Sequence, residues 1–186
     1  MQDITTKNFG LLIAYILPGF LLLWGGSHHS LTLQGWLGQT SDELPTVGGF
    51  LYVTLGSIAA GMMASTLRWL VIDTLHHWTG LRQPPWDFSQ LADRVSAFDT
   101  LIEIHYRFYQ HYANMIVALV GCLLLRWTAI GFRVGEAVAV LLLTSLYGVA
   151  SRDTLRKYYA RVAGVLGTSL MAEARVDSDE DDREST

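Results

Sequence analysis

No charged side chain interrupts LPTVGGFLYVTLGSIAAGMMASTL, the sequence of residues 44–67. A helix needs about 20 mostly apolar residues to cross the roughly 30 Å hydrocarbon core of a bilayer, so this stretch is long enough. A second uncharged stretch lies between Lys7 and Asp42, and two shorter ones cover residues 108–125 and 137–151. Together the stretches predict an all-α integral membrane protein with four transmembrane helices.

The composition fits this class, because 51% of the 186 residues are hydrophobic. We expect residues 1–72 to form a first transmembrane helical pair with an extracytoplasmic loop, and residues 108–151 a second transmembrane hairpin. Between them, residues 73–107 are expected to form a cytoplasmic helical segment continuous with the third span. Residues 152–176 are predicted to form a cytoplasmic amphipathic helix. The last ten, DSDEDDREST, carry six acidic residues and no apolar one, which predicts a disordered acidic tail at 177–186.

Lys and Arg residues are distributed unevenly between the two sides of the predicted spans. Residues 27–49 contain neither, whereas residues 68–107 contain four. Four more follow the last span, and they are Arg152, Arg156, Lys157 and Arg161. Because basic residues are retained on the cytoplasmic side, we expect a multi-pass protein of the inner (plasma) membrane with both termini cytoplasmic. Cations directly after a span also suit anionic lipid headgroups, so we assign these four to the lipid bilayer rather than to a nucleic acid.

Apolar residues recur at alternating three-residue and four-residue spacing before and into the third span. The stripe comprises Leu91, Val95, Phe98, Ile102, His105, Tyr109 and Tyr112. Such spacing is typical of a coiled coil and predicts one helix, with Asp87 as its N-cap, that continues to about Arg126. The stripe must be covered, either by an apolar face within residues 152–176 or by other copies in a homo-oligomer. Both alternatives stay open.

Polar side chains also follow helical spacing inside the predicted bilayer. They are Thr54, Ser57, Gly61, Ser65 and Arg68 on the second span, and Gln110 and Asn114 on the third. Small residues at this spacing let helices approach closely, which is one interpretation. The other is that these residues line a water-filled path through the membrane.

Catalytic and metal-binding motifs were not found in the sequence. The two His-His pairs, at 28–29 and 76–77, point about 100° apart on a helix and do not converge on one ion. We therefore expect no enzyme activity, no metal and no cofactor.

The span number and the long cytoplasmic helix resemble the small four-span membrane components of bacterial anti-phage defence systems of the Kiwa and Hailong type. The resemblance is one of architecture, and no residue role is transferred from it. It implies antiviral defence by an oligomeric channel or sensor that meets a soluble partner. Two hypotheses follow. The first is an oligomeric ion channel or membrane-permeabilising effector gated through its cytoplasmic helices. The second is a non-conducting anchor or assembly subunit that recruits a soluble cytoplasmic partner.

Overall fold

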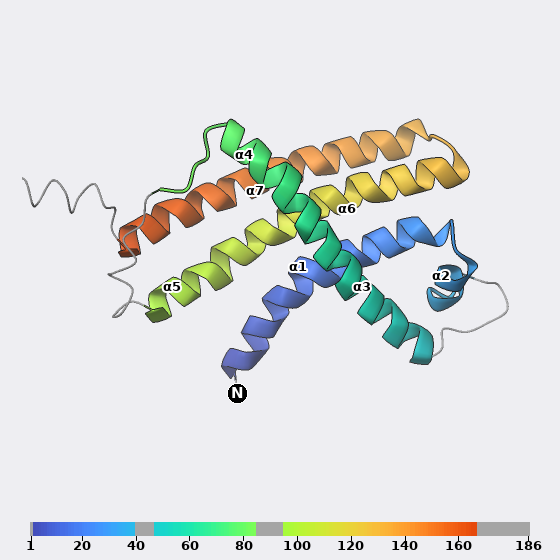
Figure 1. Ribbon diagram of the computed structural model, residues 1–186, viewed down its shortest axis with the longest axis horizontal. Helices are drawn as coiled ribbons and strands as arrows, with labels where there is room; N and C mark the ends of the chain where they lie inside the picture. The colour runs from blue at the N-terminus through green and yellow to red at the C-terminus, as the bar shows by residue number, and fades with distance from the viewer. Residues whose placement is uncertain (1, 40–46, 85–94, 167–186) are drawn as a thin grey trace, which may run out of the picture.

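The computed structural model describes residues 2–39, 47–84 and 95–166, and within these ranges the chain is helical without strands (Figure 1). Three described helical stretches are long and apolar enough to cross a membrane, and they are Val47–Trp78, Val95–Ile130 and Val134–Leu166. A shorter apolar stretch, Leu12–Ser27, lies within the first helix. These are the features of a helical membrane protein, as the sequence predicted.

The helices follow one another in this order: α1 (Gln2–Ser27), α2 (Leu31–Trp36), α3 (Val47–Arg68), η1 (Trp69–Asp73), α4 (Thr74–Trp78), α5 (Val95–Leu101), η3 (Ile102–Tyr106), α6 (Arg107–Ile130) and α7 (Val134–Leu166). The elements η1 and η3 are π-helical turns that continue directly into the α-helices on either side. Figure 1 shows α6 and α7 running side by side, with α3 and α4 crossing them.

The long helix before and within the third apolar stretch is continuous from Val95 onward, through α5, η3 and α6. Its predicted N-cap, Asp87, and the stripe residue Leu91 lie outside the described residues. At the other end the helix continues to Ile130, four residues beyond the predicted end. Gly131 stops it there, because its φ of 84° is a left-handed conformation that glycine adopts readily.

The fourth apolar stretch and the amphipathic segment after it form one helix, α7, of 33 residues. The sequence predicts a boundary between the fourth span and the amphipathic helix at residues 151 and 152, where hydropathy falls. No proline occurs in this stretch, so the backbone hydrogen bonds continue through the change in polarity.

The helices α1 and α3 cross at two glycines. A Cβ atom on Gly61 would lie 2.0 Å from the carbonyl oxygen of Tyr15, and one on Gly19 would lie 1.7 Å from that of Ser57. Both distances are far shorter than van der Waals contact, so only glycine permits this approach. The interface is therefore a contact between backbones, which is a common packing mode of membrane helices.

The apolar stripe of the long helix packs on the C-terminal half of α7. A buried cluster joins the two helices to η1, and its members are Ile72, Tyr109, Ala113, Leu155, Tyr158, Val162 and Leu166. Phe98 and Ile102 pack against this cluster, whereas Val95 is 55% exposed. Within the described part of this chain, α7 covers the stripe from Phe98 to Tyr109, and additional cover by other copies stays a prediction.

We predict that Gly61→Ala destabilises the fold through the contact with Tyr15. The added methyl forces α1 and α3 apart, at an expected loss of about 1–3 kcal/mol of unfolding free energy. The measurement is the thermal unfolding midpoint in mild detergent, followed by tryptophan fluorescence. Gly148→Ala in α7 is the matched control, because no described atom lies within 4 Å of the Cβ it would add. Equal shifts for the two variants would contradict the backbone contact.

Candidate functional site

A proline in the middle of α1 leaves one backbone carbonyl without its helical donor. Pro18 has no N–H, so the carbonyl of Ala14, four residues earlier, lacks its intrahelical hydrogen bond. The side chain of Asn114 on α6 replaces that bond, because its Nδ2 donates to the Ala14 oxygen at 2.8 Å. One turn earlier on α6, Nδ1 of His111 lies 3.0 Å from the carbonyl oxygen of Ile13. Asn114 is fully buried, so the amide acts as a contact between helices.

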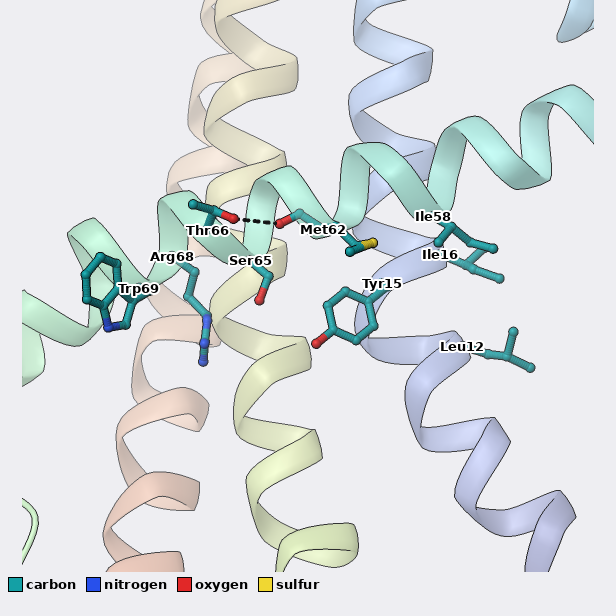
Figure 2. A pocket seen from close by; sticks show the side chains of 9 residues that line it. All are labelled: Leu12, Tyr15, Ile16, Ile58, Met62, Ser65, Thr66, Arg68 and Trp69. Atoms are coloured by element: carbon teal, nitrogen blue, oxygen red, sulfur yellow. Dashed lines mark hydrogen bonds between the residues drawn. The ribbon is translucent and has the colours of Figure 1, made fainter.

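The other predicted polar residues lie in different surroundings. Ser57 and Gly61 are buried where α3 meets α1, and Thr54 donates to the Phe50 carbonyl of its own helix at 2.8 Å. Gln110 is half-buried. Ser65 and Arg68 line a cavity between α3 and α1 (Figure 2). The structure thus buries Ser57, Gly61 and Asn114 in the packing against α1, whereas Ser65 and Arg68 line the cavity beside it.

Arg68 belongs to a polar cluster at the end of α3. Its guanidinium carbon lies 5.3 Å from the centre of the Tyr109 ring, and Nη2 lies 3.8 Å from Oδ2 of Asp73. The Tyr109 hydroxyl donates a hydrogen bond to Oδ1 of the same carboxylate. Only 5% of the Arg68 surface is exposed, so Asp73 and the tyrosine ring supply its immediate electrostatic environment.

The pairing of Asp73 with Arg68 was not predicted from the sequence, because it depends on the π-helical turn. In an α-helix, residues three or four apart share a face, and Asp73 follows Arg68 by five positions. The element η1 spaces its hydrogen bonds five residues apart, which brings the two side chains together. Single π-helical turns occur frequently at functional sites. The second one, η3, also reaches this cluster, because its Tyr106 ring packs beside that of Tyr109.

Two histidines attach the neighbouring helices to α7. Nε2 of His76 on α4 lies 3.0 Å from the Ser151 hydroxyl, and both side chains are buried. On η3, Nε2 of His105 accepts a hydrogen bond from Arg161 at 2.7 Å. The sequence placed His105 on the apolar stripe, but it gave no signal for the pairing of His76 with a serine 75 residues away.

A cavity of about 340 Å³ opens beside this cluster. Its polar lining comes from Asp73, His76, His77, Gln83, Tyr106, Tyr109, Tyr158 and Tyr159. Hydroxyl, imidazole and carboxylate groups can bind a small polar molecule or water. Among the described residues, no group of three or more His, Cys, Asp or Glu side chains is placed to hold a metal ion.

Three of the four cations after the last span make polar contacts within the chain. Arg152 donates to the Thr79 carbonyl at 2.9 Å, and Arg161 reaches His105. Lys157 pairs with Asp153 one turn away at 2.6 Å. Arg156 lies in the wall of a small cavity together with Arg152. The assignment of these residues to lipid headgroups stays a prediction.

A second charged cluster lies at the opposite end of the described helices. Nη2 of Arg126 pairs with Oε1 of Glu136 at 2.9 Å, which joins the end of α6 to the start of α7. The same guanidinium lies 4.4 Å from the centre of the Trp24 ring, and its Nη1 is 2.6 Å from Nε2 of His28. Polar contacts therefore connect the helices at both ends of the apolar region.

No protein-family model, curated protein or solved structure matches this sequence.

We predict that Asn114→Leu costs about 1–3 kcal/mol of unfolding free energy, because it leaves the Ala14 carbonyl buried without a donor. The cost should fall in a Pro18→Ala background, since the restored backbone N–H can bond that carbonyl within α1. A double-mutant cycle on reversible unfolding in detergent measures the difference. Ser145→Ala is the control, because that exposed hydroxyl bonds only the Leu141 carbonyl of its own helix. An identical cost of Asn114→Leu in both backgrounds would rule out the compensation.

Asp73→Asn is predicted to lower the unfolding free energy by about 1–3 kcal/mol, because Arg68 then stays buried beside a neutral amide. Adding Arg68→Met removes the unpaired charge and should recover part of the loss. Asp153→Asn is the matched control, since its pair with Lys157 is more than half exposed and such pairs contribute at most about 1 kcal/mol. The same detergent unfolding assay applies, and additive single effects would show that the two charges are not coupled.

Proposed function

We propose that this chain is a four-span, non-conducting assembly subunit of the inner (plasma) membrane, with both termini in the cytoplasm. It anchors a pair of packed helical segments, formed by α5, η3 and the first turn of α6 on one side and the C-terminal half of α7 on the other. We call this pair the hairpin, and it recruits a soluble partner. The resemblance to bacterial anti-phage membrane components suggests a defence protein as that partner. One observation carries the proposal: Ser57 and Asn114 are buried between helices, and the outward faces are apolar.

The outward face of α3 is an apolar surface suited to lipid. Its exposed large side chains are Phe50, Leu51, Leu55, Met62, Met63 and Leu67. The first half of α7 is similar, with Val138, Leu141, Leu142, Leu146 and Val149 exposed. The hydroxyls of Thr66 and Ser145 on these faces bond carbonyls of their own helices, so they need no water. Such a surface is compatible with the hydrocarbon core of a bilayer. It therefore supports a membrane anchor better than a protein that lines a water-filled path.

The hairpin supports the recruiting role because one of its faces packs in the buried cluster and another is apolar and exposed. Phe98, Ile102 and Tyr109 turn towards α7, where Leu155 and Val162 are buried. The opposite side of the long helix exposes Ile104 at 51% and Phe108 at 47%. Apolar groups displayed next to the expected membrane surface suit contact with another protein.

The oligomeric channel is the second candidate, and the exposure of α7 favours it. Val149 is 71% exposed and Leu142 66%, so most of the membrane half of α7 has room for other copies of the chain. A pore would then have to form between copies, because Ser57 and Asn114 are engaged with α1.

Two measurements on the full chain separate the candidates. The first is conductance of the purified protein in planar bilayers, where we expect no discrete current steps. The second is site-specific photocrosslinking in the source-cell membrane from position 104, with position 142 on the lipid-facing side of α7 as the matched control. We expect a single soluble polypeptide to crosslink from position 104 only, and Ile104→Glu to release that polypeptide from the membrane fraction.

Reproducible current steps from a defined oligomer would contradict the anchor proposal and favour the channel. Equal crosslinking from positions 104 and 142 would remove the hairpin as the recruiting surface. A chain truncated before Asp177 tests the acidic tail separately. If the truncated chain loses the partner and Ile104→Glu retains it, recruitment belongs to the tail.

A further inference from the structure

A cavity of about 700 Å³ lies between α1 and α3 (Figure 2). Leu12 and Ile16 from α1, and Ile58 and Met62 from α3, give it a mostly apolar lining. Sites for small molecules have volumes of about 300–1,000 Å³, so the cavity is large enough for a ligand. Its walls belong to helices whose outward faces suit lipid.

One end of this cavity is polar. Figure 2 shows the side chains of Tyr15, Ser65 and Arg68 together at one end, and Leu12, Ile16 and Ile58 at the other. Within the described part of the chain, Nε and Nη1 of Arg68 are buried and have no hydrogen-bond partner. Asp73 approaches only Nη2, and its 3.8 Å separation exceeds a hydrogen bond.

A buried guanidinium with two unpaired donors requires an acceptor. Leaving such donors unpaired away from water is unfavourable, and a fork of N–H groups matches the oxygens of a phosphate or carboxylate. The cavity therefore combines charge complementarity for an anion with an apolar extension. That combination describes an amphiphile.

A tryptophan beside this cavity indicates that its polar end lies at the level of lipid headgroups. Trp69 lines the cavity, follows Arg68 directly and is 67% exposed. Tryptophan settles at membrane interfaces, where its ring is partly in hydrocarbon and its N–H reaches water. On the apolar side, Leu12 and Met62 are 47% and 60% exposed, so a lipid can enter from the bilayer.

We infer that this cavity binds one anionic phospholipid. Its phosphate accepts hydrogen bonds from Nε and Nη1 of Arg68, with the Ser65 and Tyr15 hydroxyls beside it. One acyl chain lies between α1 and α3 against Ile16, Ile58 and Met62. This site does not depend on the recruitment of a soluble partner.

The test is native mass spectrometry of the detergent-solubilised full chain, titrated with phosphatidylglycerol and, in parallel, with phosphatidylcholine of the same acyl chains. We expect one phosphatidylglycerol per chain to be retained in preference to phosphatidylcholine. Arg68→Gln should weaken its binding by about tenfold or more, the usual effect of losing charge-assisted hydrogen bonds. Ile58→Trp should weaken it as well, because the indole fills the apolar part while Arg68 is intact.

Arg133→Gln is the matched control, since it removes an exposed cation between α6 and α7 outside the cavity, and it should leave binding unchanged. Circular dichroism and gel filtration establish that each variant is folded, and Ile58→Trp decides the outcome if Arg68→Gln unfolds. Equal retention of both lipids, or unchanged binding in both cavity variants, would overturn the inference. So would an equal loss in Arg133→Gln, which indicates non-specific attraction between the lipid and the charge of the protein. Displacement of the lipid by inorganic phosphate would identify a site for a free anion instead.

Discussion

The freed carbonyl of Ala14 is the constraint around which the apolar part of this protein is arranged. A bilayer offers no water to satisfy it, so another helix must bring a donor to that depth. Asn114 is that donor, and its position fixes the height and rotation of α6 against α1. The glycines at positions 19 and 61 then fix α3 against the other side of α1. One proline and two glycines thus set how the three helices meet.

The end of this helical unit depends on a different structural feature. The π-helical turns η1 and η3 change which residues share a helix face. The first packs against the hairpin, and the second is part of it. By this change Asp73 reaches Arg68 and Tyr109 at once. A regular α-helix through the same sequence would turn the carboxylate away from the buried guanidinium, with an unpaired charge as the result.

Long-period features of the structure were accessible from the sequence, and local irregularities were not. The uncharged stretches predicted the apolar helices, and the spacing of Phe98, Ile102 and Tyr109 predicted the face that α7 covers. Helical spacing also placed Ser57 and Gly61 on one face, and it favoured packing without excluding a pore, because a small polar residue satisfies either requirement. His111 was within reach, since it lies one turn before Asn114 on the same face. Asp73 and His76 were not, because a π-helical turn has no recognised sequence pattern and their partners lie far away in the chain.

The uninterrupted course of α7 has a mechanical consequence. Its 33 residues form a rod of roughly 50 Å, with one half among the apolar helices and the other half in the hairpin. Near its middle, His76 contacts Ser151 and Thr79 accepts from Arg152, so α4 is attached to the rod at this point. Arg126 and Glu136 join its start to α6, and the buried cluster joins its far half to the long helix. A force that tilts one half of α7 therefore acts on the other half as well, and the long helix moves with it.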